Sequence, residues 1–157
     1  MRVLFVSSGN SKYGASPIVK NQGESLRDFD IDVHFFTVQG KGLRGYIKNV
    51  LPLRKYVRKQ NFDVIHAHYS LSALVATLAG CRPLVVSLMG SDIRLGFLIK
   101  TAIKICSLLI WNDLIVKSQD MANNIGIDKC KIIPNGVNTT LLKPIDKKAA
   151  IEILGWD

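Results

Sequence analysis

Cysteine is scarce in this sequence, and its three copies do not suggest a framework. Cys81, Cys106 and Cys130 are an odd number, and no two of them form a C-x-x-C motif. This pattern argues against a disulfide-stapled domain and against a zinc knuckle. Reduced, buried thiols are the simpler interpretation, and they favour a cytosolic protein.

Long apolar runs are also lacking. The opening "MRVLFVSSGN" contains too short an apolar run for a signal peptide. The most apolar region, residues 95–116, is interrupted by Lys100 and Lys104, which lie one helical turn apart. A spanning helix needs about 20 apolar residues with few charges. The region therefore predicts a surface helix with one buried side, and we expect a cytoplasmic protein.

Acidic residues are outnumbered by basic ones, 12 to 21, which gives a net charge of +9. Segment 41–61 holds seven of the basic residues and no acid. Such a basic, amphipathic segment predicts peripheral contact with anionic lipid at the inner face of the cytoplasmic membrane. A solvated helix covering the sheet is the alternative, and nucleic acid is disfavoured because no recognition module is present. The predicted membrane-contact residues are Arg44, Lys48, Arg54, Lys55, Arg58 and Lys59.

Short apolar runs alternate with helical stretches along the 157 residues. The runs cover 3–7, 33–38, 63–68, 83–88, 113–118 and 131–134. The helices are expected from Ser16–Pro17 onward and over 43–59, 70–79, 93–110 and 119–125, with Pro52 breaking the second. This pattern predicts an α/β fold with a Rossmann-like, doubly wound, mainly parallel sheet of about six strands flanked by helices. The default strand order is 3-2-1-4-5-6.

Ligands of such sheets bind at the carboxyl ends of the strands, which selects loops 8–15, 39–42, 68–70, 89–92 and 118–120. The first loop, "GNSKYGAS", has the glycine spacing of a P-loop but Ala15 in place of its lysine. Gly9 and Gly14 permit close backbone approach or positive φ. The helix start at Ser16 then offers an anion pocket, to which Lys12 could add charge. A plain turn remains the alternative, and the absence of G-x-G-x-x-G argues against NAD.

Two further motifs carry polar side chains at strand ends. In "HAH", His66 and His68 face the same way on a strand, so a metal site is one reading. The other reading has His66 packed in the sheet and His68 as a polar site residue. In "LMGSD", a glycine turn precedes Asp92, which is a good N-cap for the following helix.

Taken together, "DVIHAH", "PLVVSLMGSD", "DLIVKSQDM" and above all "KIIPNGVNTTLLKP" resemble family 4 glycosyltransferases. These are retaining, nucleotide-sugar-dependent enzymes of the GT-B fold, in which two Rossmann-like domains face each other across a cleft. The resemblance covers the N-terminal, acceptor-binding half. It implies an N-terminal domain over 1–143, with 144–157 as the linker and the start of a C-terminal donor domain. The paired-glutamate E-x7-E motif of that second domain is absent, so a truncated chain or one part of a split enzyme is expected.

The resemblance also implies a set of functions. We expect a hexosyltransferase that moves a sugar from a UDP- or GDP-sugar donor to a glycan or lipid-linked acceptor in cell-surface polysaccharide synthesis. This half alone is expected to be inactive and to bind no cofactor or metal. A non-catalytic module docking on anionic membrane or on a partner subunit is the alternative. The substrate-binding residues that the family resemblance implies are Gly14, Ala15, Ser16, His68, Gly90, Ser91, Asp92, Lys117, Ser118 and Asn135.

One departure from the family pattern concerns the turn after the fourth apolar run. The family usually has histidine beside the transferred sugar, where this chain has Met89. Methionine offers its backbone carbonyl but no imidazole, so no catalytic residue is assigned.

Overall fold

Six parallel strands form the centre of the molecule. The computed structural model describes residues 1–12, 14–94, 96–137, 139 and 143–156. The strands are β1 (Arg2–Ser8), β2 (Asp32–Val38), β3 (Val64–His68), β4 (Leu84–Ser87), β5 (Asp113–Val116) and β6 (Lys131–Ile132). Every neighbouring pair is parallel. The predicted Rossmann-like α/β fold with six strands is confirmed.

The predicted strand order is wrong. The sheet runs β2-β1-β3-β4-β5-β6. The chain places β2 on one side of β1 and then crosses over to place β3 to β6 on the other side. In the predicted order this crossover comes only after the third strand. The difference is visible in burial: β1 is buried along its interior, whereas β2 carries half-exposed side chains and is an edge strand. The order places the switch point between β1 and β3, where such folds bind ligands.

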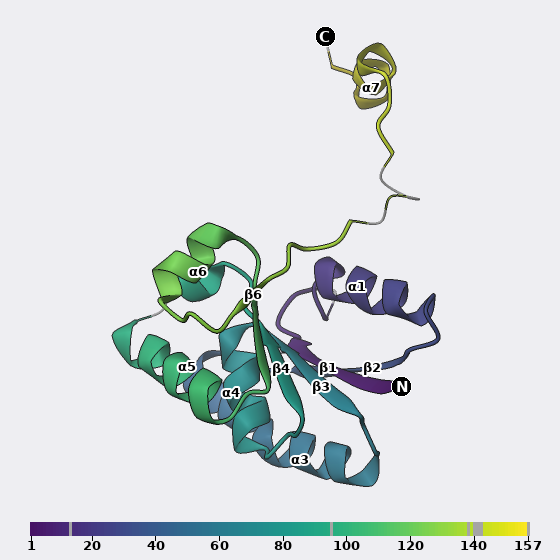
Figure 1. Cartoon of the computed structure of the whole chain (residues 1–157). Helices are drawn as coiled ribbons and strands as arrows, with labels where there is room; N and C mark the ends of the chain where they lie inside the picture. The colour runs from purple at the N-terminus through teal and green to yellow at the C-terminus, as the bar shows by residue number, and fades with distance from the viewer. Residues whose placement is uncertain (13, 95, 138, 140–142, 157) are drawn as a thin grey trace.

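Helices cover the two faces unequally (Figure 1). On one face lies α1 (Pro17–Arg27), which contacts β1 and β2. On the other lie α3 (Val50–Lys59), α4 (Ser70–Leu78) and α5 (Phe97–Leu109). The remaining elements are α2 (Gly42–Ile47), the 3-10 helix η1 (Ser91–Arg94), α6 (Gln119–Ile125) and α7 (Lys147–Leu154).

Helix boundaries follow local chemistry in three places. The Ser16 hydroxyl accepts a hydrogen bond from the Val19 N–H at 3.4 Å, and the Ser118 hydroxyl accepts one from the Met121 N–H at 3.2 Å. Gly126 ends α6 in the left-handed conformation with φ 61°. The predicted helix start at Ser16 is confirmed, and α6 is capped at both ends.

Two predicted boundaries are wrong. The break in the basic segment falls at Lys48–Asn49, and Pro52 lies inside the first turn of α3, where no intrahelical donor is lost. Residues 93–110 do not form one helix, because η1 precedes α5 and Gly96 is the N-cap of α5. Asp92 is therefore not the N-cap of that helix.

The interior divides between the two faces of the sheet. The larger cluster joins alternate residues of the central strands to α3, α4, α5 and α6, with Leu53, Leu84 and Ile103 among its fully buried members. The smaller one joins Val3, Phe5 and Val33 to Val19 of α1. Burial of this kind is the main term that stabilises a domain, at roughly 25 cal/mol per Å² of apolar surface.

Beyond β6 the chain leaves the sheet and ends in α7, which stands apart from it in Figure 1. Asp146 caps this helix by accepting hydrogen bonds from Lys148 and Ala149, and none of the helix residues is buried. Within the described residues, no helix has the length and the apolar content needed to cross a bilayer.

Candidate functional site

The five loops selected from the sequence gather at one edge of the sheet, because all six strands point the same way. Contacts between loops confirm this. Asn10 exchanges two hydrogen bonds of 2.8 Å with the backbone of Gly40, which ties the loop after β1 to the loop after β2. The Tyr46 hydroxyl of α2 lies 3.4 Å from the Ser8 hydroxyl at the end of β1. Polar contacts therefore tie the loop after β1 to the loop after β2 and to α2.

The opening loop is a compact turn. The Gly14 N–H donates to the Ser11 carbonyl at 3.1 Å, and Gly14 has φ 75°, as its glycine predicts. Gly9 has a different role: a Cβ there would lie 2.7 Å from Thr37 Cβ, so this glycine allows close packing on β2. Ala15 is buried, and Ser16 is half-buried at the start of α1. The free N–H groups of this helix start face the loop side.

Asp92 joins two of the loops. It is 1% exposed, and both of its carboxylate oxygens accept backbone hydrogen bonds. One comes from the Ser70 N–H at 2.8 Å, at the start of α4, and the other from the Met89 N–H at 2.5 Å. The turn between Met89 and Asp92 needs Gly90, which has φ 98°. Asp92 thus holds the end of β3 and the end of β4 in a fixed relation.

The two histidines of β3 stack on the face that carries α1. Their ring centroids are 4.2 Å apart, and Phe5 packs against both. His66 shares a hydrogen bond of 2.8 Å with the Ser87 hydroxyl. Burial, and after it the charge of Lys117, lowers the pKa of His66 to about 4. Burial also lowers the pKa of His68, so both rings are neutral near pH 7.

His68 was predicted as a polar site residue at the strand end, and its side chain is 1% exposed there. Both of its ring nitrogens lack a hydrogen-bond partner within the described chain, as do the buried hydroxyls of Ser7, Ser70 and Ser72. Unpaired buried polar groups destabilise a fold. Their concentration around the start of α4 marks a region whose polarity does not serve stability.

Lys117 lies at the end of β5, close enough for its charge to act on both histidines. Its own pKa is lowered by burial. The structure thus places Lys117 near His68. Ser91 and Ser118 are exposed at the same edge, whereas Asn135 lies in the exposed segment after β6.

Tyr69 was missed by the sequence-based selection. It follows His68 directly and has φ 80° and ψ 140°. Its side chain is half-buried, and its pKa is raised by burial and by the nearby Asp92 and Tyr46. The only sequence signal was its position, at the junction of a strand end with a helix start.

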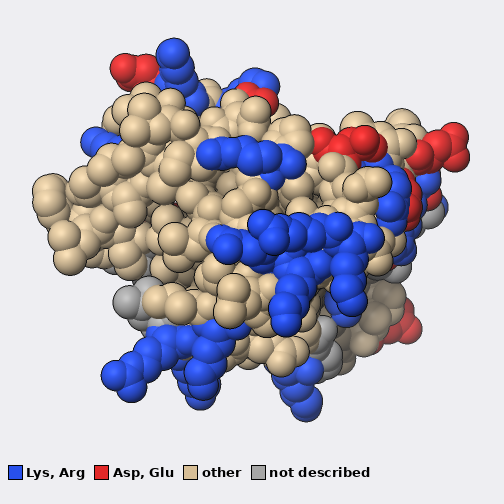
Figure 2. All heavy atoms as spheres, turned by 90° about the horizontal axis from the view of Figure 1, so that it is seen from below, with Lys and Arg blue, Asp and Glu red and all other residues tan. Residues whose placement is uncertain are grey.

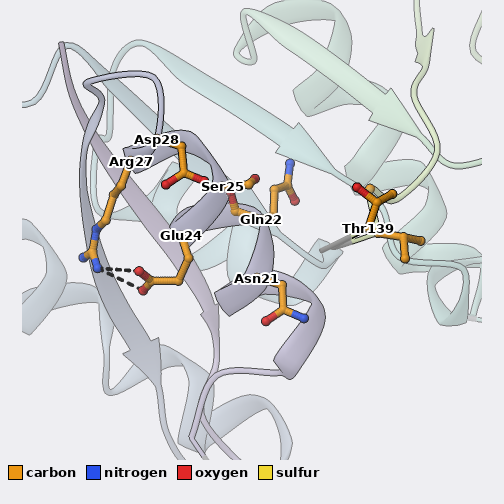
Figure 3. A pocket seen from close by; sticks show the side chains of 9 residues that line it. Asn21, Gln22, Glu24, Ser25, Arg27, Asp28 and Thr139 are labelled. Carbon is orange, nitrogen blue, oxygen red and sulfur yellow. Dashed lines mark hydrogen bonds and ion pairs between the residues drawn. The ribbon is translucent and has the colours of Figure 1, made fainter. Parts of the chain in front are cut away.

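A separate hollow lies away from this edge. Figure 3 shows a pocket of about 480 Å³ between α1 and the segment after β6. Its lining includes Asn21, Gln22 and Thr139, and the Glu24 carboxylate there pairs with Arg27 at 2.9 Å. None of the predicted site residues lines it. A second hollow, of about 450 Å³, does include Gly14 and Ala15. We place the candidate site at the switch point, because the buried, unpaired polar groups lie there.

Comparison with protein families identifies the family of the chain. Residues 15–114 match the family model described as glycosyl transferase 4-like. The chain belongs to the glycosyl transferase 4-like family. The match includes the start of α1, the basic segment, both histidines and the turn at Met89.

Solved structures agree on the fold of this glycosyl transferase 4-like chain. Sucrose-phosphate synthase from Thermosynechococcus elongatus matches 99% of this chain and 53% of its own length, with a TM-score of 0.75 and 15% identity. HepE from Anabaena, in complex with UDP and glucose, matches 98% of this chain and 50% of its own, with a TM-score of 0.65 and 19% identity. The chain thus spans about half of each. No curated protein sequence matches it.

The basic segment of this glycosyl transferase 4-like chain lies on the face shown in Figure 2, the lower face of Figure 1. Lys and Arg side chains gather over its middle, and Asp and Glu lie toward its rim. Five of the six predicted contact residues are exposed: Arg44, Lys48, Lys55, Arg58 and Lys59. The sixth is half-buried.

That residue, Arg54, has a structural role within the chain. Its guanidinium donates to the Leu78 carbonyl at 2.7 Å and to the Ala79 carbonyl at 3.1 Å. These are among the last carbonyls of α4, which lack intrahelical partners. Arg54 therefore caps α4.

Metal ligands do not gather at this edge. Among the described residues, no three His, Cys, Asp or Glu side chains lie close enough to hold a metal ion. The two stacked histidines are thus packed in the sheet without a third ligand nearby.

Proposed function

We propose that this chain is the acceptor-side half of a retaining glycosyltransferase that uses a UDP- or GDP-sugar. The observation that carries the proposal is the family match over residues 15–114. Two facts support the finer statement. The chain spans about half of the solved structures it matches, and one of those was solved with UDP and glucose. A hexose donor and a glycan or lipid-linked acceptor at the cytoplasmic membrane face belong to the same proposal.

The physical task of this half is to hold an acceptor hydroxyl where a donor can reach it. Positioning of this kind can supply several kcal/mol of the barrier reduction, about 7 or more in well-oriented cases. The ring of loops at the β1–β3 switch point offers hydroxyls, amides and the cation Lys117 for that purpose. Residues 144–157 would open the donor half, which would hold the nucleotide.

An NMR titration of the 157-residue chain tests whether this half binds the acceptor and leaves the nucleotide to the donor half. We expect methyl glucoside, galactoside or mannoside to shift the amides of the five loops, and UDP alone to shift none strongly. Shifts confined to the pocket along α1 would contradict the proposed site. Sugar transfer from UDP-glucose or GDP-mannose by this chain without a partner would contradict the proposal that the half is inactive alone.

A second function, docking on anionic membrane, is favoured by a separate observation. Besides the exposed cations of the basic segment, α5 exposes a row of large apolar side chains at helical spacing. Phe97, Leu98, Ile105, Leu108 and Leu109 are each more than half exposed, from 51% to 81%. Apolar insertion next to basic contacts is how interfacial helices bind bilayers.

Vesicle co-sedimentation separates this function from the first. Binding to phosphatidylglycerol vesicles should fall when Lys55 and Lys59 are changed to Glu, and should weaken in high salt. Changing Lys147 and Lys148 to Glu is the matched control, because these lysines lie on α7, away from the basic segment. Equal binding by all three proteins would contradict docking through the basic segment.

A further inference from the structure

Tyr69 has a backbone conformation that a tyrosine adopts only under constraint. Among the described residues other than glycine, only Asp30 and Tyr69 have positive φ. Asp30, at φ 57°, lies in the left-handed region in the exposed turn before β2. Tyr69, at φ 80° and ψ 140°, lies outside that region and close to the one that glycine alone enters readily. Such strain tends to persist at functional sites.

Three hydrogen bonds from different elements fix this conformation. The Tyr69 N–H donates to the Ser87 carbonyl of β4 at 2.9 Å, and the Tyr69 carbonyl accepts from the Ala73 N–H at 3.0 Å. The next residue, Ser70, donates its N–H to the Asp92 carboxylate at 2.8 Å. The strained turn is thus held by β4, by α4 and by Asp92.

The Tyr69 side chain contributes little to the packing of the fold. Tyr69 belongs to neither buried apolar cluster. Within the described chain its hydroxyl has no hydrogen bond, whereas the hydroxyl of the neighbouring Tyr46 pairs with Ser8. The phenol lies near Asp92 and Tyr46, and so beside the β1–β3 switch point. An unpaired phenol on a constrained backbone, at the place where the fold binds ligands, is suited to contact one.

We propose that Tyr69 contacts the sugar acceptor and that Asp92 is the positioning residue that holds it there. The ring would pack on the apolar face of a pyranose, and the hydroxyl would hydrogen-bond to one of its hydroxyls. This assignment rests on the proposed function, since it names the sugar-binding contact of the same site.

Thermal unfolding tests the strain. At a position with ordinary backbone dihedrals, a protein with Gly is less stable than one with Ala, but at a strained positive φ the order of stability reverses. We expect Tyr69→Gly to have a Tm several degrees above that of Tyr69→Ala. Glycine relieves the backbone strain and alanine does not, and a strain energy of this kind shifts the Tm of a domain of this size by several degrees. The Tm values of Asp30→Gly and Asp30→Ala provide the matched comparison, because Asp30 also has positive φ. A Tyr69→Gly protein with a lower Tm than Tyr69→Ala would overturn the inference.

Binding of methyl hexosides, followed by NMR, tests the contact. Tyr69→Phe should bind about three- to tenfold more weakly, as expected for loss of one neutral hydrogen bond. Tyr69→Gly should lose more than tenfold, and Asp30→Gly should bind as the parent does. Glycoside binding that Tyr69→Gly leaves unchanged overturns this assignment alone. No glycoside binding by the parent protein overturns the proposed function and the assignment together.

The positioning role of Asp92 has its own readout. Asp92→Asn turns an amide donor toward an N–H donor, so one of its two backbone bonds is lost. If Asp92 acts through Tyr69, Asp92→Asn weakens glycoside binding in the parent but has no further effect in the Tyr69→Gly background. Equal weakening in both backgrounds would show a merely structural role and overturn this part.

Discussion

Acid should unfold this protein through His66, and the size of the effect follows from its surroundings. The ring is buried against Phe5 and His68, and its pKa falls from 6.5 to about 4 on folding. Below pH 6.5 the unfolded chain binds a proton that the folded chain refuses. The stabilisation is thus complete above pH 6.5 and is lost as pH falls from 6.5 to about 4. For one such group the loss is about 2 kcal/mol at pH 5 and about 3 kcal/mol at pH 4.

The test compares the parent with His66→Gln, which does not titrate and can still pair with the Ser87 hydroxyl. Urea unfolding is followed by the fluorescence of Trp111, which is 6% exposed. Between pH 7.5 and pH 5 the parent should lose about 2 kcal/mol more than the variant. His68 is present in both proteins, but His66→Gln also removes the charge that helps to lower the pKa of His68, so the difference reports the two stacked rings together. Parallel pH profiles, or an NMR titration midpoint of His66 near 6.5, would refute the reasoning.

Three further substitutions test local contacts by denaturant unfolding. Gly45→Ala should destabilise by about 1–3 kcal/mol, because its Cβ would lie 2.6 Å from the backbone of Gly40; an unchanged Tm would contradict this. Thr77→Val should cost about 1–3 kcal/mol, since the Trp111 indole N–H donates to Thr77 Oγ1 at 2.8 Å, and Thr77→Ser should restore most of it. Ser118→Ala should cost about 1 kcal/mol through loss of the α6 N-cap, and Ser118→Asp should not.

Local features of the fold were predictable because local chemistry determines them. Short apolar runs predicted all six strands, and the hydroxyl of Ser16 before Pro17 predicted the start of α1. Strand order was not predictable in this way. It depends on which distant strand pairs with β1, and an edge strand such as β2 differs from a central one only in degree of exposure.

The candidate site was predictable by region but not by role. The strand-end rule selected the loops, yet the sequence suggested that Asp92 caps the helix after it. Its carboxylate instead accepts from Ser70 and Met89. A carboxylate satisfies whichever N–H groups the fold brings near, and Ser70 is distant in sequence. Tyr69 was missed because glycine is the usual sequence signal of a positive φ, and this position holds a tyrosine.

The place of β1 in the sheet has a consequence for how the protein is made. Val3 pairs with Val33 on one side and with Val64 on the other. Strand β1 precedes both of its neighbours in the chain, so it leaves the ribosome before either of them and stays half-paired until β3 has been synthesised. Pairing between parts so distant in sequence slows folding and exposes strand edges meanwhile. During synthesis, a chaperone or a misfolded neighbouring chain would therefore bind at the unpaired side of β1.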